Sequence, residues 1–125
     1  MNTEERDAII EKLKEEYPIM EQVKFNEFNV AEKLQMNMEL KIKYQELYEH
    51  NLFVLNKLKD KYEELKGKRY DFYRFESDRN LSKTEVEQYY MPQDRKLKEF
   101  KQLMEKQEVK VAFFKLCMSS IGELY

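Results

Sequence analysis

The side chains best suited to chemistry in this 125-residue chain lie in one short run, from Lys66 to Phe75. These ten residues include four bases, one acid and four aromatic side chains. Bases can follow a phosphate backbone, and aromatic faces can stack on unpaired nucleobases for ~1–3 kcal/mol each. The combination favours a surface for single-stranded nucleic acid with little sequence preference. Three upstream bases, Lys57, Lys59 and Lys61, could extend it.

The same run also allows a purely structural interpretation. Phe72, Tyr73 and Phe75 could pack the elbow at which a long helix turns back, with the bases as a solvated rim. The sequence leaves both interpretations open.

Catalytic patterns are absent from the sequence. His50 is the only histidine, and there is no Cys/His cluster, glycine-rich phosphate loop or nucleophile–base pair. The carboxylates stand at helical spacing beside lysine and arginine, which is typical of solvated helix faces. The only cysteine, Cys117, lies in an apolar run and is interpreted as a small buried hydrophobic residue. We therefore expect a non-enzymatic protein with no metal and no cofactor.

The elements that must position the basic–aromatic run are predicted to be helices. Two glycines and two prolines supply few turns, and 42% hydrophobic with 38% charged residues is typical of long amphipathic helices. We expect a first helix from Asn2 or Thr3 to Glu16, ended by Pro18. A connector over 19–29 then leads into one long helix over 30–75.

The second half of the chain is predicted to return as a helix. Residues 76–80 break the apolar pattern and are expected to form a loop. Ser82 and Glu85 have capping-box spacing, which predicts a short helix over 83–90. Pro92 suits the first turn of the last helix. The expected fold is therefore all-α: a short N-terminal part, 1–27, followed by a long helical hairpin, 28–125, with an amphipathic C-terminal oligomerisation helix.

The last helix shows the clearest periodicity. Its three-four stripe consists of Leu97, Phe100, Met104, Gln107, Val111, Phe114, Met118 and Ile121. From Val109 onward a second face is apolar too, which requires cover on several sides. In so small a chain we expect other subunits to provide that cover. The predicted oligomerisation residues are Val111, Phe113, Phe114, Cys117, Met118 and Ile121.

Three parts of the chain resemble the UvsY recombination mediator family of T4-like bacteriophages. One is the entry to the long helix, Lys33-Leu34-Gln35, followed by Tyr44-x-x-Leu47-Tyr48. Another is the basic cluster of Lys66, Lys68 and Arg69, which runs into Tyr70-Asp71-Phe72-Tyr73. The last is the closing amphipathic helix with its end rich in Phe, Leu and Cys.

The resemblance implies a ring-like homo-oligomer that binds single-stranded DNA in the cytoplasm of an infected host cell. It further implies that the ring helps to load a RecA-like recombinase onto DNA covered by single-strand-binding protein. The implied phosphate contacts are Lys66, Lys68, Arg69 and Arg74. The implied stacking or groove-shaping residues are Tyr70, Phe72 and Tyr73.

A different class of protein is the alternative: a helical-hairpin chaperone or assembly scaffold that grips protein clients through its apolar helix ends. Such a scaffold does not need the basic–aromatic run. The acidic, polar start of the chain does not fit a signal peptide, and no stretch approaches the ~20 apolar residues of a membrane span. We therefore expect a cytoplasmic location without membrane contact.

Overall fold

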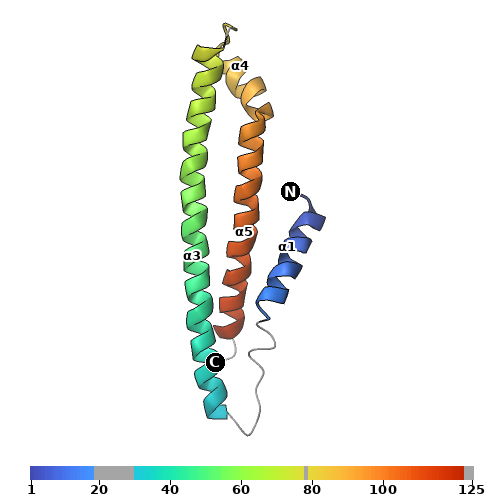
Figure 1. Ribbon diagram of the computed structural model, residues 1–125, viewed down its shortest axis with the longest axis vertical. Helices are drawn as coiled ribbons and strands as arrows, with labels where there is room; N and C mark the ends of the chain where they lie inside the picture. The colour runs from blue at the N-terminus through green and yellow to red at the C-terminus, as the bar shows by residue number, and fades with distance from the viewer. Residues whose placement is uncertain (19–29, 78, 123–125) are drawn as a thin grey trace. The chain divides into compact units, whose positions relative to one another are not determined.

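The computed structural model describes residues 1–18, 30–77 and 79–122, with side chains from residue 38 onward in the second range. Within this part of the chain the backbone is helical almost throughout and contains no strand, which confirms the predicted all-α class (Figure 1). The chain divides into two compact units. One contains Met1–Val54 and Lys106–Tyr125, and the other contains Leu55–Glu105.

The first unit begins with α1 (Thr3–Glu16), whose start was predicted correctly. The Asn2 side chain accepts a hydrogen bond from the Glu5 N–H at 2.8 Å and so satisfies one of the helix's unpaired donors. The helix ends at the predicted place, with Tyr17 as C-cap and Pro18 directly after it. The predicted connector over 19–29 lies outside the described residues.

Apolar side chains from three helices form the core of the first unit. They come from α1, from α3 (Val30–Asp71) and from α5 (Arg95–Gly122). The buried members are Leu13, Tyr44, Phe113, Phe114, Cys117 and Ile121. The Phe114 ring lies edge-on to Tyr17, with 5.1 Å between their centroids.

This core bears on one sequence-based expectation. Phe113, Phe114, Cys117 and Ile121 are buried, and Met118 packs against them, with α1 and α3 of the same chain as cover. The sequence pattern showed that cover was needed without showing which helix supplied it. Val111 is half-buried. The oligomerisation role of all six residues stays a prediction.

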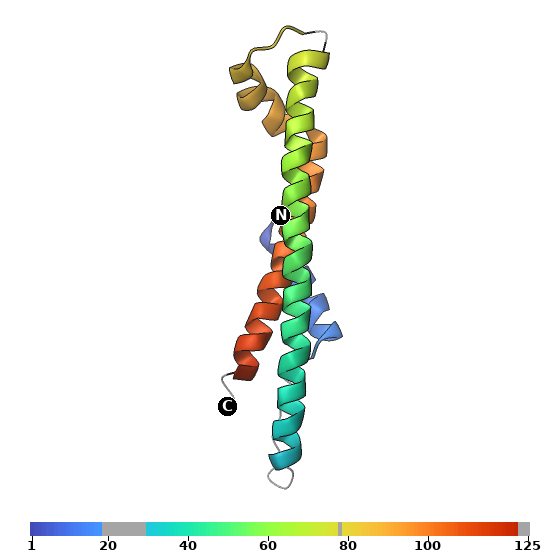
Figure 2. The ribbon, with the colours of Figure 1, turned by 90° about the vertical axis from the view of Figure 1, so that its left-hand side faces the viewer.

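In the second unit, the end of α3 and the beginning of α5 lie side by side and run in opposite directions (Figure 1). Tyr62 of α3 stacks on Phe100 of α5 with 6.0 Å between ring centroids. Val86 and Leu97 are buried. Short helical turns connect the two arms: η2 (Phe72–Glu76), α4 (Lys83–Glu85), η3 (Val86–Tyr90) and η4 (Met91–Gln93). Figure 2 shows α4 and the turns after it standing to one side of α3.

The boundaries of these elements agree closely with the predicted ones. Residues 30–76 are helical, although the last turn, η2, is a π-helical turn closed by the Ser77 N–H bond to the Phe72 carbonyl at 2.9 Å. The predicted capping box is present between Ser82 and Glu85. Pro92 lies in the 3₁₀ turn η4, so α5 itself begins three residues later, at Arg95.

Candidate nucleic-acid interface

The basic–aromatic run lies at the tip of the hairpin in the second unit, where α3 passes into η2. The π-helical turn widens the last helical turn and changes the direction of its side chains. The Ser77 hydroxyl donates to the Tyr73 carbonyl at 2.8 Å, which ties the loop back onto the turn. Ser77 is therefore anchored on the last helical turn.

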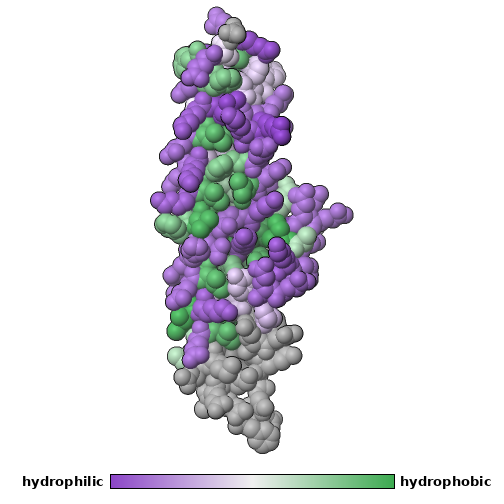
Figure 3. All heavy atoms as spheres, in the orientation of Figure 1, coloured by the Kyte–Doolittle hydropathy of each residue, from purple (hydrophilic) through white to green (hydrophobic). Residues whose placement is uncertain are grey.

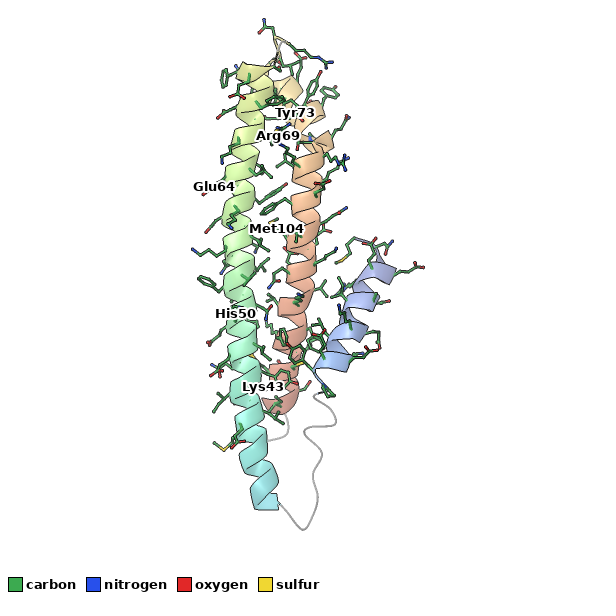
Figure 4. All side chains as sticks on the ribbon, viewed as in Figure 1. Lys43, His50, Glu64, Arg69, Tyr73 and Met104 are labelled. Atoms are coloured by element: carbon green, nitrogen blue, oxygen red, sulfur yellow. The ribbon has the colours of Figure 1, made fainter. Side chains whose placement is uncertain are left out.

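A buried carboxylate, Asp94, joins the two arms below this tip. Its side chain is 1% exposed and accepts hydrogen bonds from the Arg69 Nε at 2.7 Å and the Tyr73 hydroxyl at 2.5 Å. The other carboxylate oxygen accepts the Leu97 N–H at 2.9 Å and caps the first turn of α5. Figure 4 shows Arg69 and Tyr73 reaching from α3 and η2 toward α5.

These contacts fix the protonation state of the cluster. Burial alone would raise the pKa of Asp94, but the hydrogen bonds from Tyr73, the Leu97 N–H and Arg69 outweigh it, so the pKa lies below its ordinary value. The bond to Asp94 raises the pKa of the Arg69 guanidinium. Burial, followed by the bond to Asp94, raises the pKa of Tyr73. The cluster is therefore a carboxylate held by a charged guanidinium and a neutral phenol.

Ring contacts extend from this cluster across the tip. The Arg69 guanidinium lies over the Phe72 ring at 4.5 Å and near the Tyr73 ring at 5.2 Å. Tyr73 contacts Tyr90 of η3 at 5.5 Å between centroids. Arg79 donates from Nη1 to the Tyr90 hydroxyl at 2.9 Å. A continuous series of rings and guanidinium groups thus links both arms of the hairpin.

The outer side of the tip leaves other members of the run accessible. Lys68 is exposed, the Phe72 residue is 38% exposed and Phe75 is 72% exposed. Lys66 is half-exposed and lies 3.6 Å from the Glu63 carboxylate. Such an exposed pair contributes little to stability, and another anion can readily replace the Glu63 carboxylate beside Lys66.

The remaining two residues of the predicted set form a pair of their own. The Arg74 Nη1 donates to the Tyr70 hydroxyl at 3.0 Å, and both side chains are half-buried. The Arg74 guanidinium also lies 5.8 Å from the centroid of the Phe75 ring. An exposed aromatic ring with a cation beside it is an arrangement suited to stacking on a nucleobase.

The structure therefore divides the seven predicted DNA-binding residues by their accessibility. The Arg69 Nε and the Tyr73 hydroxyl are bonded to Asp94, so neither of these two groups is free for a phosphate or a base. The packing interpretation fits Tyr73 but not Phe75, whose ring faces solvent. Sequence reasoning missed Asp94, although an Asp after Pro-Gln and before the apolar stripe is a recognisable N-cap.

Further bases and an acid occupy the outer face of α3 next to the tip. Lys57, Lys61 and Lys68 fall within roughly 40° of one another at about 100° per residue. Glu64 lies in the same stripe, and Figure 4 shows it pointing away from α5. The proposed basic track is thus interrupted by one carboxylate.

Cys117 and His50 are two further side chains with reactive groups. Cys117 is buried, and desolvation raises the pKa of its thiol to about 11, so the nucleophilic thiolate is scarce at neutral pH. His50 is exposed. Among the described residues, no three Cys, His, Asp or Glu side chains form a group that could hold a metal ion.

Comparisons with protein-family models, curated proteins and solved structures found no match for this chain. In the described part of the chain, none of the helices combines the length and the apolar character needed to cross a membrane. The resemblance to the recombination mediator family therefore stays a prediction based on the motifs alone.

Proposed function

We propose that this protein is a non-enzymatic, single-stranded-DNA-binding protein and that the hairpin tip is its DNA-binding surface. The observation that supports it best is the gathering of accessible cations and aromatic faces at the tip, with Lys68, Phe72 and Phe75 on its outer side. Exposed aromatic faces beside cations offer surfaces on which unpaired bases can stack.

In this proposal the members of the run have two different roles. The phosphate contacts are Lys66, Lys68 and Arg74, and the stacking faces are Tyr70, Phe72 and Phe75. Arg69 and Tyr73 act indirectly. They bind Asp94 and so hold the tip in one conformation, which lowers the entropic cost of binding.

We further propose that the protein acts as a recombination mediator. As an oligomer it would hold single-stranded DNA covered by single-strand-binding protein and help to load a RecA-like recombinase. The motif resemblance supports this role. Linked tips would raise the avidity of weak individual sites by about 10²–10⁴.

Lysine footprinting tests where the DNA binds. The protein is acetylated with and without a single-stranded oligonucleotide, and the modification of each lysine is quantified by mass spectrometry. We expect protection of Lys66 and Lys68, and none of the exposed Lys12 on α1. Equal reactivity with and without the oligonucleotide, or protection at Lys12 alone, would contradict the proposed surface.

A scaffold for protein clients is the second candidate, because an apolar groove is open between α1 and α5. If the protein is a scaffold, we expect no protection of the tip lysines from acetylation when the oligonucleotide is added. The same footprint therefore separates the two functions, since a client peptide would shield α1 and α5 and leave Lys68 reactive.

A further inference from the structure

The groove between α1 and α5 in the first unit has a cavity volume of about 500 Å³. Its walls are largely apolar, with Ile10 from α1 and Val109, Ala112 and Leu116 from α5. The Leu116 residue is 68% exposed. Figure 3 shows apolar surface where α1 meets α5, framed by hydrophilic side chains. This is a larger apolar opening than single scattered surface residues would give.

The shape of the groove indicates what it can hold. Its lining residues recur at helical spacing from Arg6 to Tyr17 on α1 and from Val109 to Ser120 on α5. Each wall therefore extends for roughly 16 Å at 1.5 Å per residue. A long apolar groove between two helices fits the apolar face of a third helix.

The charges at the groove restrict that helix further. Arg6 and Lys14 line it, and no carboxylate does so within the described part of the chain. Lys14 lies 3.6 Å from Glu11, but both side chains are more than half exposed, so the pair contributes little. The groove thus favours a helix face that combines apolar side chains with carboxylates.

A stripe with this chemistry lies on α3 of the same unit. Met38, Ile42 and Phe53 are 60%, 57% and 59% exposed and lie along one side of the helix. Glu46 and Glu49 are exposed between them. At about 100° per residue all five positions fall within roughly 80° of the helix circumference.

The stripe faces away from the groove's own core. Tyr44, which is fully buried, and Leu47, which packs on the core, lie roughly 150° around α3 from its centre. The stripe therefore cannot reach the groove of its own chain, but it is available to a second copy.

We propose that the α3 stripe of one copy binds in the α1–α5 groove of the next copy. Ile42 and Phe53, about 16 Å apart along the helix, would span the groove with Met38 beyond one end, while Glu46 and Glu49 pair with Arg6 and Lys14. Because groove and stripe are different surfaces, the contact can repeat head to tail as a ring or a filament, or close as a two-fold dimer in which each groove holds the stripe of the other copy. This interface does not rest on DNA binding, and it differs from the buried C-terminal residues predicted from the sequence.

Charge reversal tests the pairing without disturbing the core. Arg6→Glu with Lys14→Glu makes a groove variant, and Glu46→Lys with Glu49→Lys makes a stripe variant. Native mass spectrometry and sedimentation give the oligomer mass, and far-UV circular dichroism checks helical content. We expect the parent to assemble and each variant alone to fall to the monomer mass.

Mixing the two variants is the decisive step. Each groove then meets a stripe of opposite charge on the other variant, so assemblies in which the variants alternate should form again. Lys12→Glu, an exposed change on α1 outside the groove, should keep the parent mass.

A monomeric parent, variants that assemble as the parent does, or a mixture that stays monomeric would each overturn the interface. If a reversed variant loses helical content, Arg6→Gln with Lys14→Gln replaces it. We then expect that variant to raise the dissociation constant of the assembly at least tenfold. A smaller increase would overturn the interface. None of these changes touches the hairpin tip, so this result is independent of the DNA-binding proposal.

Discussion

The Asp94 carboxylate has two structural roles. One carboxylate oxygen caps the first turn of α5, and the other receives Arg69 and Tyr73 from the opposite arm. A buried carboxylate without partners would be costly, whereas one with three hydrogen bonds stabilises the charged form. The arms of the hairpin are thereby held at a fixed register next to the tip.

Replacing this carboxylate by an amide should weaken the tip. Asp94→Asn retains an oxygen for the Leu97 N–H but loses the charge that Arg69 requires. We expect the free energy of unfolding to fall by about 1–3 kcal/mol, measured by urea denaturation. The control is Glu99→Gln, which removes the exposed pair with Arg95 and should cost about 0–1 kcal/mol. Equal effects of the two changes would show that the Asp94 cluster is not a stabilising element.

The same cluster predicts an acid dependence of stability. The folded-state pKa of Asp94 lies below its ordinary value of 3.8, so its contribution is complete above that value. The contribution should be lost as the pH falls through the lowered folded-state pKa. The difference in unfolding free energy between the parent and Asp94→Asn should therefore be constant near neutral pH and shrink below about pH 4. A difference that grows toward acid would contradict this assignment.

Phe75 is the residue at which base stacking can be tested. Its ring is 72% exposed, so Phe75→Ala should leave stability nearly unchanged. We expect weaker binding of a single-stranded oligonucleotide, by ~1–3 kcal/mol if one base stacks there, with the same salt dependence. Fluorescence anisotropy at several salt concentrations measures both quantities. The matched control is Leu103→Ala, an exposed apolar truncation on α5, which should not change affinity.

At the scale of the helices, one polar pair sets how α3 and α5 align in the first unit. The Gln107 side-chain amide donates to both the carbonyl and the side-chain oxygen of Asn51, at 2.9 and 3.0 Å. Asn51 in turn donates to the Leu47 carbonyl at 2.7 Å. A one-turn slip of either helix would leave these buried groups without partners, so the pair disfavours other registers.

A double-mutant cycle tests that role. Asn51→Ala, Gln107→Ala and the double variant are compared by the free energy of unfolding. We expect a coupling energy of about 0.5–1.5 kcal/mol, because either single change removes the hydrogen bond between the two side chains, whereas the bond to the Asn51 backbone carbonyl is lost only in Gln107→Ala. Strictly additive effects would show that the two side chains do not depend on each other.

Local signals in the sequence predicted most of the helices. Asn2, Pro18 and the Ser82–Glu85 capping box act on their own turns, so their effects can be read from neighbouring residues. The partner of Arg69 could not be read in this way, because Asp94 lies 25 residues further along the chain. For the same reason the apolar face of the C-terminal helix predicted a partner surface without identifying α1.

The candidate site was only partly predictable for a related reason. Composition identified the run from Lys66 to Phe75, but residue type does not tell which aromatic ring is buried. Tyr73 and Phe75 are two residues apart in η2, and the Tyr73 hydroxyl is bonded to Asp94 whereas the Phe75 ring is exposed to solvent. That distinction depends on the backbone geometry of a single turn.

At the scale of the whole molecule, the proposed assembly and the proposed DNA binding would reinforce each other. A single tip offers few cations and one or two exposed rings, which corresponds to a weak site. Copies joined through the groove and stripe would present several such tips to one strand, and linkage raises their combined affinity. The proposed function therefore needs both a DNA-binding tip and self-association, and each property can be tested without the other.

The salt dependence of binding to single-stranded DNA tests the central claim most directly. Anisotropy titrations of a labelled oligonucleotide, from low to physiological salt, are compared for the parent, Lys68→Ala and Glu64→Gln at matched oligomer mass. We predict that the parent binds and weakens steeply with salt. Lys68→Ala should flatten the slope of log K against log salt concentration by about 0.7 per lost phosphate contact, and Glu64→Gln should tighten binding. A parent that does not bind single-stranded DNA even at low salt, or a slope that Lys68→Ala leaves unchanged, would contradict the account.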